Sequence, residues 1–131
     1  MDIPIRVSTS TLLKGIRCIR AERDIKAGEL IESCPVILIP LDEYEALGKT
    51  VMSNYDFIWD DTYEALVLGY GSLYNHSYTP NAFYKRNFET RKMEYIALHN
   101  IEKDGEIFLN YNGVPDDSSP LEHQDHINFR F

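Results

Sequence analysis

The chain has 131 residues, of which 44% are hydrophobic, and these totals predict one soluble globular domain with a single core. Its 21 acidic and 13 basic residues give a formal net charge of -8 at pH 7. This charge repels the phosphate backbone of nucleic acids and favours a basic partner, although an acidic surface also serves solubility alone.

The N-terminal segment does not resemble a signal peptide. Residues 1–4 contain no basic n-region, and no apolar run in the chain approaches the ~18 residues that span a bilayer. We therefore expect no membrane partner and an intracellular, cytoplasmic location. Cys18 and Cys34 form no CxxC pair, so we expect reduced thiols in the core rather than a disulfide or a structural zinc site.

Extended segments are predicted throughout the first third of the chain. Residues 3–7 alternate apolar with polar or proline positions, which indicates a half-buried strand, and a second short strand is expected over residues 15–21. Residues 23–31 place a turn at 26–28 between two extended pieces. The β-branched, apolar residues 36–41 predict a further strand.

One short helix and an aromatic hairpin are predicted next. Asp42 and Glu45 have the spacing of a capping box, and Gly48 can end the helix. In residues 55–59 aromatic side chains alternate with others, and after a polar turn residues 63–68 return as a mostly apolar strand. Phe57 and Trp59 are assigned to the core.

A second hairpin follows, with residues 82–84 and 93–98 as its strands and a polar connection between them. Asp104 and Gly105 mark a turn before a strand over residues 107–111. Residues 112–120 have the composition of a loop or tail. Many short strands with closely spaced turns indicate a mainly β domain.

The segment between the two hairpins contains an unusual concentration of polar groups. Residues 71–81 read GSLYNHSYTPN. Asn, Ser and the residue before Pro favour a turn, but a turn needs no imidazole or phenol. The amide, imidazole and phenol groups together suit a polar ligand. Alternatively, this is an ordinary loop with a structural histidine.

Three separated segments resemble motifs of the SET-domain protein methyltransferases. Residues 75–81 are similar to the NHSxxPN signature of that family, and residues 105–113 (GEIFLNYNG) resemble its segment of GEE, hydrophobic residues and tyrosine. Residues 23–31 (RDIKAGELI) resemble its RDIxxGExI segment. All three occur in the family's order, and the resemblance spans Ile3 to Gly113. The small size of the chain is similar to that of the compact SET proteins of bacteria and large viruses.

The resemblance implies a SET-domain fold of the β-clip type, with several short sheets and one or two short helices. In this fold the C-terminal segment passes under a preceding loop and forms a pseudoknot, which would place residues 75–81 beside residues 105–113. The expected domain covers residues 1–113, and residues 114–131 form a C-terminal tail.

The resemblance also implies an activity, namely methyl transfer from S-adenosylmethionine to a lysine ε-amine of a basic protein, without a metal. Tyr111 matches the family's catalytic tyrosine. Asn75 and His76 match its cofactor-binding pair, although a purely structural role for His76 is an open alternative. Tyr55 lies where compact SET proteins carry a second tyrosine that lines the lysine channel, and a place in the core is its alternative.

One departure from the family concerns the cofactor pocket. The family has a GxG segment near its start, where glycine lets the backbone approach the donor closely, and this chain has none. Alignment on Gly15 puts Arg17 at the second glycine, whereas counting back from Asp24 puts Cys18 there. All three are candidate cofactor-binding residues, and Arg17 would meet the donor carboxylate or remain solvated.

A second departure concerns the tail. Many eukaryotic relatives end in a zinc-binding cysteine cluster that completes the lysine channel, and no cysteine follows Cys34. Phe129 or Phe131 could replace that cluster, in cis or from the second subunit of a homodimer. His123 and His126 do not make a closed metal site.

Two other functions compete with the enzyme hypothesis. The missing GxG also fits a catalytically inactive SET-like module that binds a basic protein segment. A β-clip carbohydrate-binding domain would share only residues 23–31 and would leave Asn75 and Tyr111 unexplained.

Overall fold

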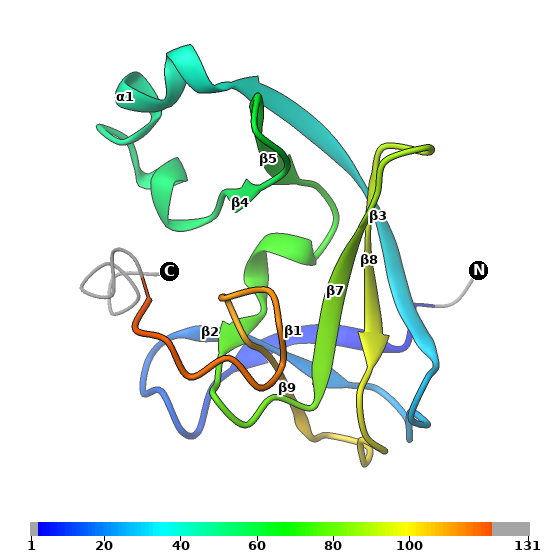
Figure 1. Ribbon diagram of the computed structural model, residues 1–131. Coiled ribbons are helices and arrows are strands. Elements are labelled where there is room, and N and C mark those ends of the chain that lie inside the picture. The colour runs from blue at the N-terminus through cyan, green and yellow to red at the C-terminus, as the bar shows by residue number, and fades with distance from the viewer. Residues whose placement is uncertain (1–2, 122–131) are drawn as a thin grey trace.

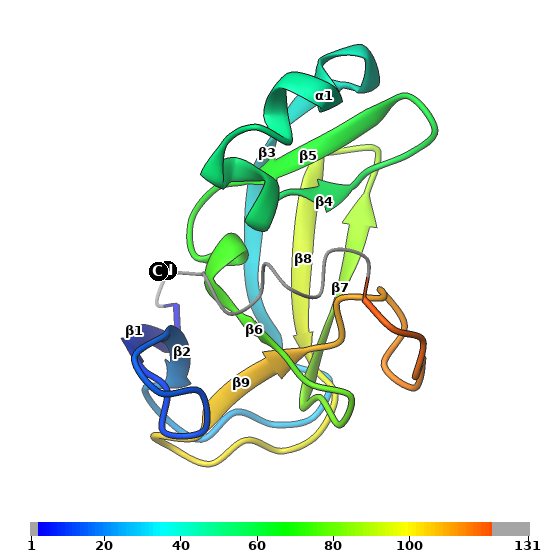
Figure 2. The same ribbon diagram turned by 90° about the vertical axis from the view of Figure 1, so that its left-hand side faces the viewer.

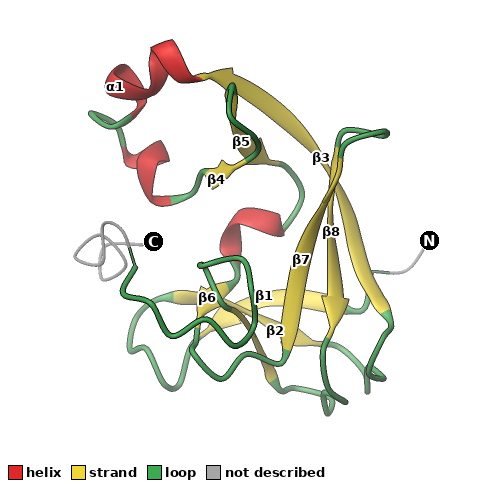
Figure 3. Cartoon of the chain, in the orientation of Figure 1, coloured by secondary structure: helices red, strands yellow, loops and turns green. Residues whose placement is uncertain are grey.

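The computed structural model describes residues 3–121 and arranges them in two β-sheets around one core (Figures 1 and 3). The described strands are β1 Ile5–Thr9, β2 Arg17–Ala21, β3 Leu30–Pro40, β4 Phe57–Ile58, β5 Tyr63–Val67, β6 Asn75–His76, β7 Ala82–Asn87, β8 Lys92–Ala97 and β9 Glu106–Leu109. The helices are α1 Tyr44–Leu47 and the short 3-10 segments η1 Leu41–Glu43, η2 Val51–Asn54 and η3 Gly71–Leu73. The prediction of a mainly β protein is confirmed.

The first sheet has the strand order β1-β2-β9-β6. The β1–β2 hairpin is antiparallel, β9 pairs antiparallel with β2, and β6 pairs parallel with β9. The C-terminal strand is therefore inserted between the N-terminal hairpin and the short strand Asn75–His76 (Figure 2). The pairing of β6 with β9 places residues 75–81 beside residues 105–113, as the resemblance to SET domains implied.

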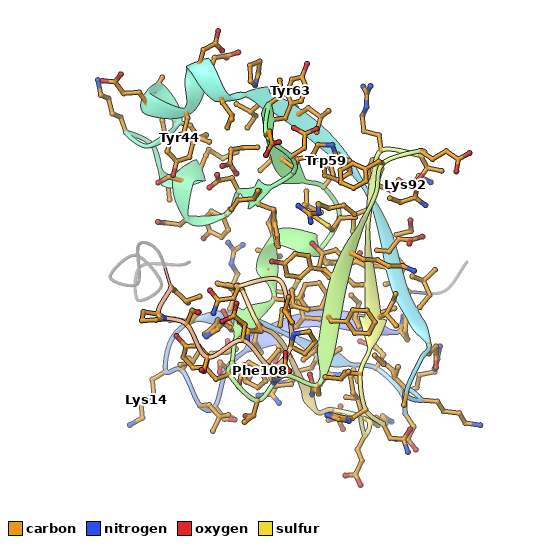
Figure 4. The ribbon with its side chains drawn as sticks, in the orientation of Figure 1. Lys14, Tyr44, Trp59, Tyr63, Lys92 and Phe108 are labelled. Atoms are coloured by element: carbon orange, nitrogen blue, oxygen red, sulfur yellow. The ribbon has the colours of Figure 1, made fainter. Side chains whose placement is uncertain are left out.

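The second sheet has the order β4-β5-β3-β8-β7. The long strand β3 is central, because its first half pairs with β8 and its second half with β5. Both predicted hairpins, β4–β5 and β7–β8, are confirmed. Trp59 follows β4, is 3% exposed and packs edge-on against Phe88 beyond the end of β7, so its predicted core position is also confirmed (Figure 4).

Several predicted strand boundaries were wrong. The strand predicted from residue 36 begins at Leu30, because the preceding residues pair with β8. β7 continues to Asn87 for the same reason, and the last strand ends at Leu109 rather than Tyr111. Tyr55 lies outside β4, at the C-terminal end of η2. Hydrogen bonding to neighbouring strands, rather than local composition, decides these ends.

The predicted capping box is also wrong. Pro40 precedes η1 directly, so Asp42 already lies inside a helical turn, and Glu43 at the start of α1 makes no capping bond with its side chain. The end of the helix was predicted correctly, since the Gly48 N–H donates to the Tyr44 carbonyl at 2.9 Å. The last extended residue before the helical turns is Pro40, whose side chain has no hydrogen-bond acceptor, so Asp42 lies too late in the chain to act as the predicted cap.

The hydrophobic core cluster is continuous between the two sheets and includes Cys34, and Cys18 is also buried. Cys18 is 0% exposed and Cys34 is 1% exposed, and both are free thiols, as predicted. Burial raises the pKa of both thiols, and a nearby carboxylate, Glu106 for Cys18 and Glu32 for Cys34, raises it further. Both cysteines are therefore inert core residues at neutral pH.

Candidate active site

The polar turn and the C-terminal motif lie side by side. Asn75 is paired with Phe108 and His76 with Leu109, and the Ser77 N–H donates to the Leu109 carbonyl at 2.9 Å. The predicted contact between residues 75–81 and 105–113 is thus confirmed. Asn81 reinforces it, because its side-chain amide donates to the Glu106 carbonyl and accepts from the Phe108 N–H, each at 2.9 Å.

Asn75 connects the turn to the start of β2. Its side chain is almost fully buried, and Nδ2 donates to the Arg17 carbonyl at 2.8 Å. The amide therefore fixes the backbone of the segment that replaces the GxG motif. The structure brings two predicted cofactor-binding residues together, while cofactor binding itself stays a prediction.

His76 holds the backbone of Tyr111. Its Nδ1 accepts a hydrogen bond from the Tyr111 N–H at 3.0 Å, which places the imidazole proton on Nε2. The ring lies 4.5 Å from the Tyr78 ring and 5.2 Å from the Tyr111 ring, measured between centroids. Nε2 is buried without a hydrogen-bond partner among residues 3–121. This buried donor is available to a ligand or to water.

Hydrogen bonds hold both the backbone and the side chain of Tyr111. Besides the bond to His76, its hydroxyl donates to the Tyr74 carbonyl, and its own carbonyl accepts from the Tyr84 hydroxyl at 3.3 Å. The side chain is half-buried against the core. Tyr111 therefore presents an oriented phenol group beside a backbone carbonyl.

Tyr84 is a site residue that the sequence reasoning assigned only to a strand. It lies on β7, its ring packs edge-on against Phe57 at 5.1 Å, and burial raises the pKa of its hydroxyl to about 12. Its position in the sequence, two residues after Ala82, does not indicate a role in the site. Only the pairing of β7 with β8 and the course of residues 109–111 bring it to Tyr111.

The segment from Gly15 to Cys18 is exposed at its first residue and buried at its last. Gly15 has a φ of +79°, and a Cβ added there would meet no atom within 4 Å. Arg17 is exposed, whereas Cys18 is fully buried. The Cys18 side chain therefore faces the core, and only its backbone is available to a ligand. The assignment of these three residues to the cofactor pocket stays a prediction.

The loop before this segment is anchored by a buried serine. Ser10 is 4% exposed, and its hydroxyl reaches both carboxylate oxygens of Glu106, at 2.8 and 3.0 Å. The same oxygen accepts from the Leu13 N–H at 2.9 Å, while Lys14 projects outward (Figure 4). Sequence reasoning missed this contact, because 96 positions separate its two partners.

The remaining candidate residues lie as follows. Tyr55 is half-buried at the C-terminal end of η2, and its place in a lysine channel stays a prediction. His99 is exposed in the turn after β8 and lines a surface hollow of ≈ 470 Å³ with Tyr78 and Pro115 among others. His123, His126, Phe129 and Phe131 lie outside the described residues.

The described part of the tail is bonded to the domain. Asn110 donates to the carbonyls of Pro115 and Asp117, and Asn112 donates to those of Asp117 and Ser119. These side-chain amides hold residues 114–119 against the end of β9. The boundary proposed at Gly113 stays a prediction.

Two features are absent from the part of the chain that the structure describes. Between residues 3 and 121, no group of three or more His, Cys, Asp or Glu side chains could hold a metal ion. Over the same range, no helix has both the length and the apolar character needed to cross a membrane.

His76 should make the stability of the protein sensitive to mild acid. Burial lowers its pKa below the ordinary value of 6.5, so the unfolded chain binds a proton more readily than the native protein. The stabilisation is complete above pH ~6.5 and is lost as the pH falls through the lower native pKa. Urea unfolding between pH 7.5 and 5 should show this loss in the wild type.

His76→Gln keeps an acceptor for the Tyr111 N–H but cannot titrate. The difference in pH dependence between the wild type and this variant isolates His76 from other groups. The same substitution at the exposed His99 should leave the acid-dependent loss in place. Identical pH profiles for the wild type and His76→Gln would contradict the assignment.

Comparison with known proteins places this geometry in a family. The SET domain model matches residues 16–112. A Schizosaccharomyces pombe protein described as a histone-lysine N-methyltransferase, H3 lysine-37 specific, is 32% identical over 96 residues, which are 72% of this chain and 65% of the relative.

Two solved structures share the fold. A crystal structure of a candidate histone methyltransferase from Plasmodium falciparum superposes with a TM-score of 0.70 and 33% identity, covering 85% of this chain and 95% of that one. A humanized mutant of the Chaetomium thermophilum Polycomb Repressive Complex 2, bound to the inhibitor GSK126, gives a TM-score of 0.70 at 19% identity. It covers 85% of this chain and 15% of that one, and this match shows the fold alone.

The chain belongs to the SET-domain family, since the family model covers well over half of its length. It spans 65% of the length of the Schizosaccharomyces pombe relative. The strand order, the Asn75–His76 strand and the oriented Tyr111 are therefore features of a SET domain.

Proposed function

We propose that this SET domain transfers a methyl group from S-adenosylmethionine to the ε-amine of a lysine in a basic protein. The observation that carries the proposal is the double attachment of Tyr111 to the central turn, through His76 Nδ1 and the Tyr74 carbonyl. This attachment gives one phenol oxygen a defined direction, as methyl transfer along a single line of attack requires.

The residues around the turn fit the donor. Its carboxylate is complementary to the exposed guanidinium of Arg17, and its adenine suits the unpartnered Nε2–H of His76. The open space at Gly15 would admit a close approach of the donor to the backbone. When bound, the donor supplies a methyl group on a sulfonium, and the electron pair of the broken S–C bond stays on sulfur.

Residues around Tyr111 would favour a neutral substrate lysine and orient its amine for methyl transfer. An ammonium has no lone pair, so the amine must arrive neutral, and the half-buried surroundings of Tyr111 disfavour its charged form. The Tyr111 oxygen and the Tyr74 carbonyl would orient the amine and stabilise the partial positive charge of the methyl group. A proton leaves the methylated amine to water.

The charge of the chain supports the substrate class. A net charge of -8 attracts lysine-rich segments and repels nucleic acid. The names of both more similar relatives refer to histone methylation. We therefore propose a basic protein tail, such as that of a histone, as the substrate.

The direct test combines transfer with donor binding. The protein is incubated with tritiated S-adenosylmethionine and a panel of core histones and other basic proteins, with an acidic protein as the negative control. We expect label on lysines of a basic protein, and micromolar or tighter donor binding by calorimetry. Absence of both transfer and donor binding would overturn the proposal.

The alternative is a catalytically inactive SET-like module that binds a basic segment. The specific observation in its favour is the missing GxG segment: depending on the alignment, either the exposed Arg17 or the buried Cys18 stands at the second glycine. Such a module would capture a histone tail without transfer of label. Thermal melting with and without the donor separates the cases, since a binding-competent enzyme melts at a higher temperature with donor present.

Ser10→Ala should weaken donor binding. The substitution removes the bond to Glu106 and the acceptor of the Leu13 N–H, so the loop of residues 10–16 loses its anchor. A hydrogen bond to a charged group contributes about 1.5–3 kcal/mol, so we expect Kd for the donor to rise roughly tenfold or more by calorimetry.

Ser8→Ala is the matched control for this loop. Ser8 lies on β1 and accepts a bond from Arg20, so its loss leaves the Ser10 anchor intact. Donor affinity should stay close to that of the wild type. Equal affinities for Ser10→Ala and Ser8→Ala would show that the anchor does not shape the donor site.

A further inference from the structure

A buried carboxyl group on β3 is not used by the chemistry above. Glu32 is 6% exposed, although its neighbour Ile31 also faces the core at 3%. Strict alternation would send one of the two outward, but the register between β3 and β8 shifts between Leu30 and Glu32. Such a bulge re-aims the side chains that follow it, and here it turns Glu32 inward.

Glu32 is held by three donors inside the core. The Tyr74 hydroxyl donates to Oε1 at 2.8 Å, and the Cys34 thiol and the Tyr70 N–H donate as well. Burial raises the pKa of Glu32, and these bonds act in the opposite direction. An apolar side chain of similar volume would avoid the desolvation of a carboxyl group, so packing alone does not explain a glutamate here.

The contacts continue from Glu32 to the candidate transfer point. Tyr74 is 1% exposed, and its ring stacks on Tyr95 with centroids 4.8 Å apart and an interplanar angle of 17°. Its ring face and its hydroxyl are therefore both fixed. The carbonyl of the same residue accepts the hydroxyl of Tyr111.

We propose that Glu32 is a positioning residue for methyl transfer, which fixes the Tyr74 carbonyl, and with it the Tyr111 hydroxyl, through its bond to the Tyr74 side chain. The inference rests on the proposed function and deepens it. Glu32 acts through Tyr74 and takes no part in the transfer itself. Tyr74, held by its stack on Tyr95, thereby links the Glu32 contact on β3 to the orientation of the Tyr111 hydroxyl, which follows β9.

The test is a set of variants along this path. Tyr74→Phe removes one hydroxyl and keeps the stack on Tyr95, Glu32→Leu removes every acceptor, and Glu32→Gln retains an acceptor for Tyr74. In assays with tritiated donor and core histones, Tyr74→Phe and Glu32→Leu should each lower kcat by up to about 100-fold. KM for donor and histone should stay within about twofold of the wild type, and Glu32→Gln should restore part of kcat.

The double variant Glu32→Leu/Tyr74→Phe and a matched control complete the set. Both single changes break the same bond, so the double variant should be no slower than the slower single variant. Glu64, another buried carboxyl group, lies on β5, and Glu64→Leu should leave kcat unchanged in the folded protein. Wild-type kcat in folded Tyr74→Phe, multiplicative effects in the double variant, or an equal loss in Glu64→Leu would each overturn the proposal.

A second measurement does not depend on activity. The 13Cζ resonance of Tyr111, assigned by its loss in Tyr111→Phe, reports the hydrogen bond of its hydroxyl. It should shift in Glu32→Leu and Tyr74→Phe but not in Glu64→Leu. If the wild type transferred no label to any protein, the proposed function would fail, and an unchanged Tyr111 resonance would separately overturn the role of Glu32.

Discussion

Tyr111→Phe should lower kcat for methyl transfer by about 100-fold, the loss typical of removing one pre-oriented polar group from a transition state. The variant keeps the ring against His76 but loses the oxygen and its bond to the Tyr74 carbonyl. The amine then has no phenol oxygen to align it, while the bond from Asn75 to the Arg17 backbone in the proposed donor site stays in place. Steady-state assays with tritiated donor measure the change, and mass spectrometry counts the methyl groups added.

Donor affinity separates a chemical effect from a folding effect in this variant. Calorimetry should give Kd for the donor within about twofold of the wild type, because the role proposed for the missing oxygen is in the transition state. Tyr63→Phe on β5 removes a tyrosine hydroxyl from the other sheet and should leave kcat unchanged. Wild-type kcat and an unaltered number of methyl groups in Tyr111→Phe would remove Tyr111 from the site.

Gly71→Ala should be the most destabilising single methyl addition. A Cβ at Gly71 would lie 2.2 Å from Val67 Cγ1 and 2.7 Å from the Tyr95 hydroxyl oxygen. Val67 is β-branched on a strand, and the buried Tyr95 hydroxyl donates to the Gly71 carbonyl at 3.0 Å, so neither neighbour can move freely. Overpacking of this kind costs about 1–3 kcal/mol or more, which urea unfolding measures.

Gly48→Ala is the control for this substitution. Gly48 has an ordinary helical φ of -62°, and its added Cβ would lie 3.5 Å from the nearest carbonyl oxygens. The free energy of unfolding should therefore stay close to that of the wild type. Equal unfolding midpoints for Gly71→Ala and Gly48→Ala would contradict the tight packing around Gly71.

The local part of the fold was predictable from residue patterns. Two hairpins, the turn at residues 26–28 and the end of the helix at Gly48 depend on neighbours in the sequence, and all are present. The capping box failed because Pro40 carries β3 directly into η1. The early start of β3 also escaped prediction, because pairing with β8 decides it.

The sequence predicted the motif residues of the candidate site but not the contacts that these residues make with distant segments. Asn75, His76 and Tyr111 were found by their resemblance to a family, and the structure joins them through the parallel pairing of β6 and β9. The contacts of Tyr84 and Glu106 were missed, because their partners are remote in the sequence.

The sequence by itself determined the family, the mainly β character and the identity of the polar turn, because these depend on residue types at fixed spacing. Only the tertiary structure decided what the turn is attached to. The bulge after Leu30 turns Glu32 inward, and the insertion of β9 brings Tyr111 to His76. Both depend on strand register, which hydrogen bonds between distant segments set and which no local pattern of side chains encodes.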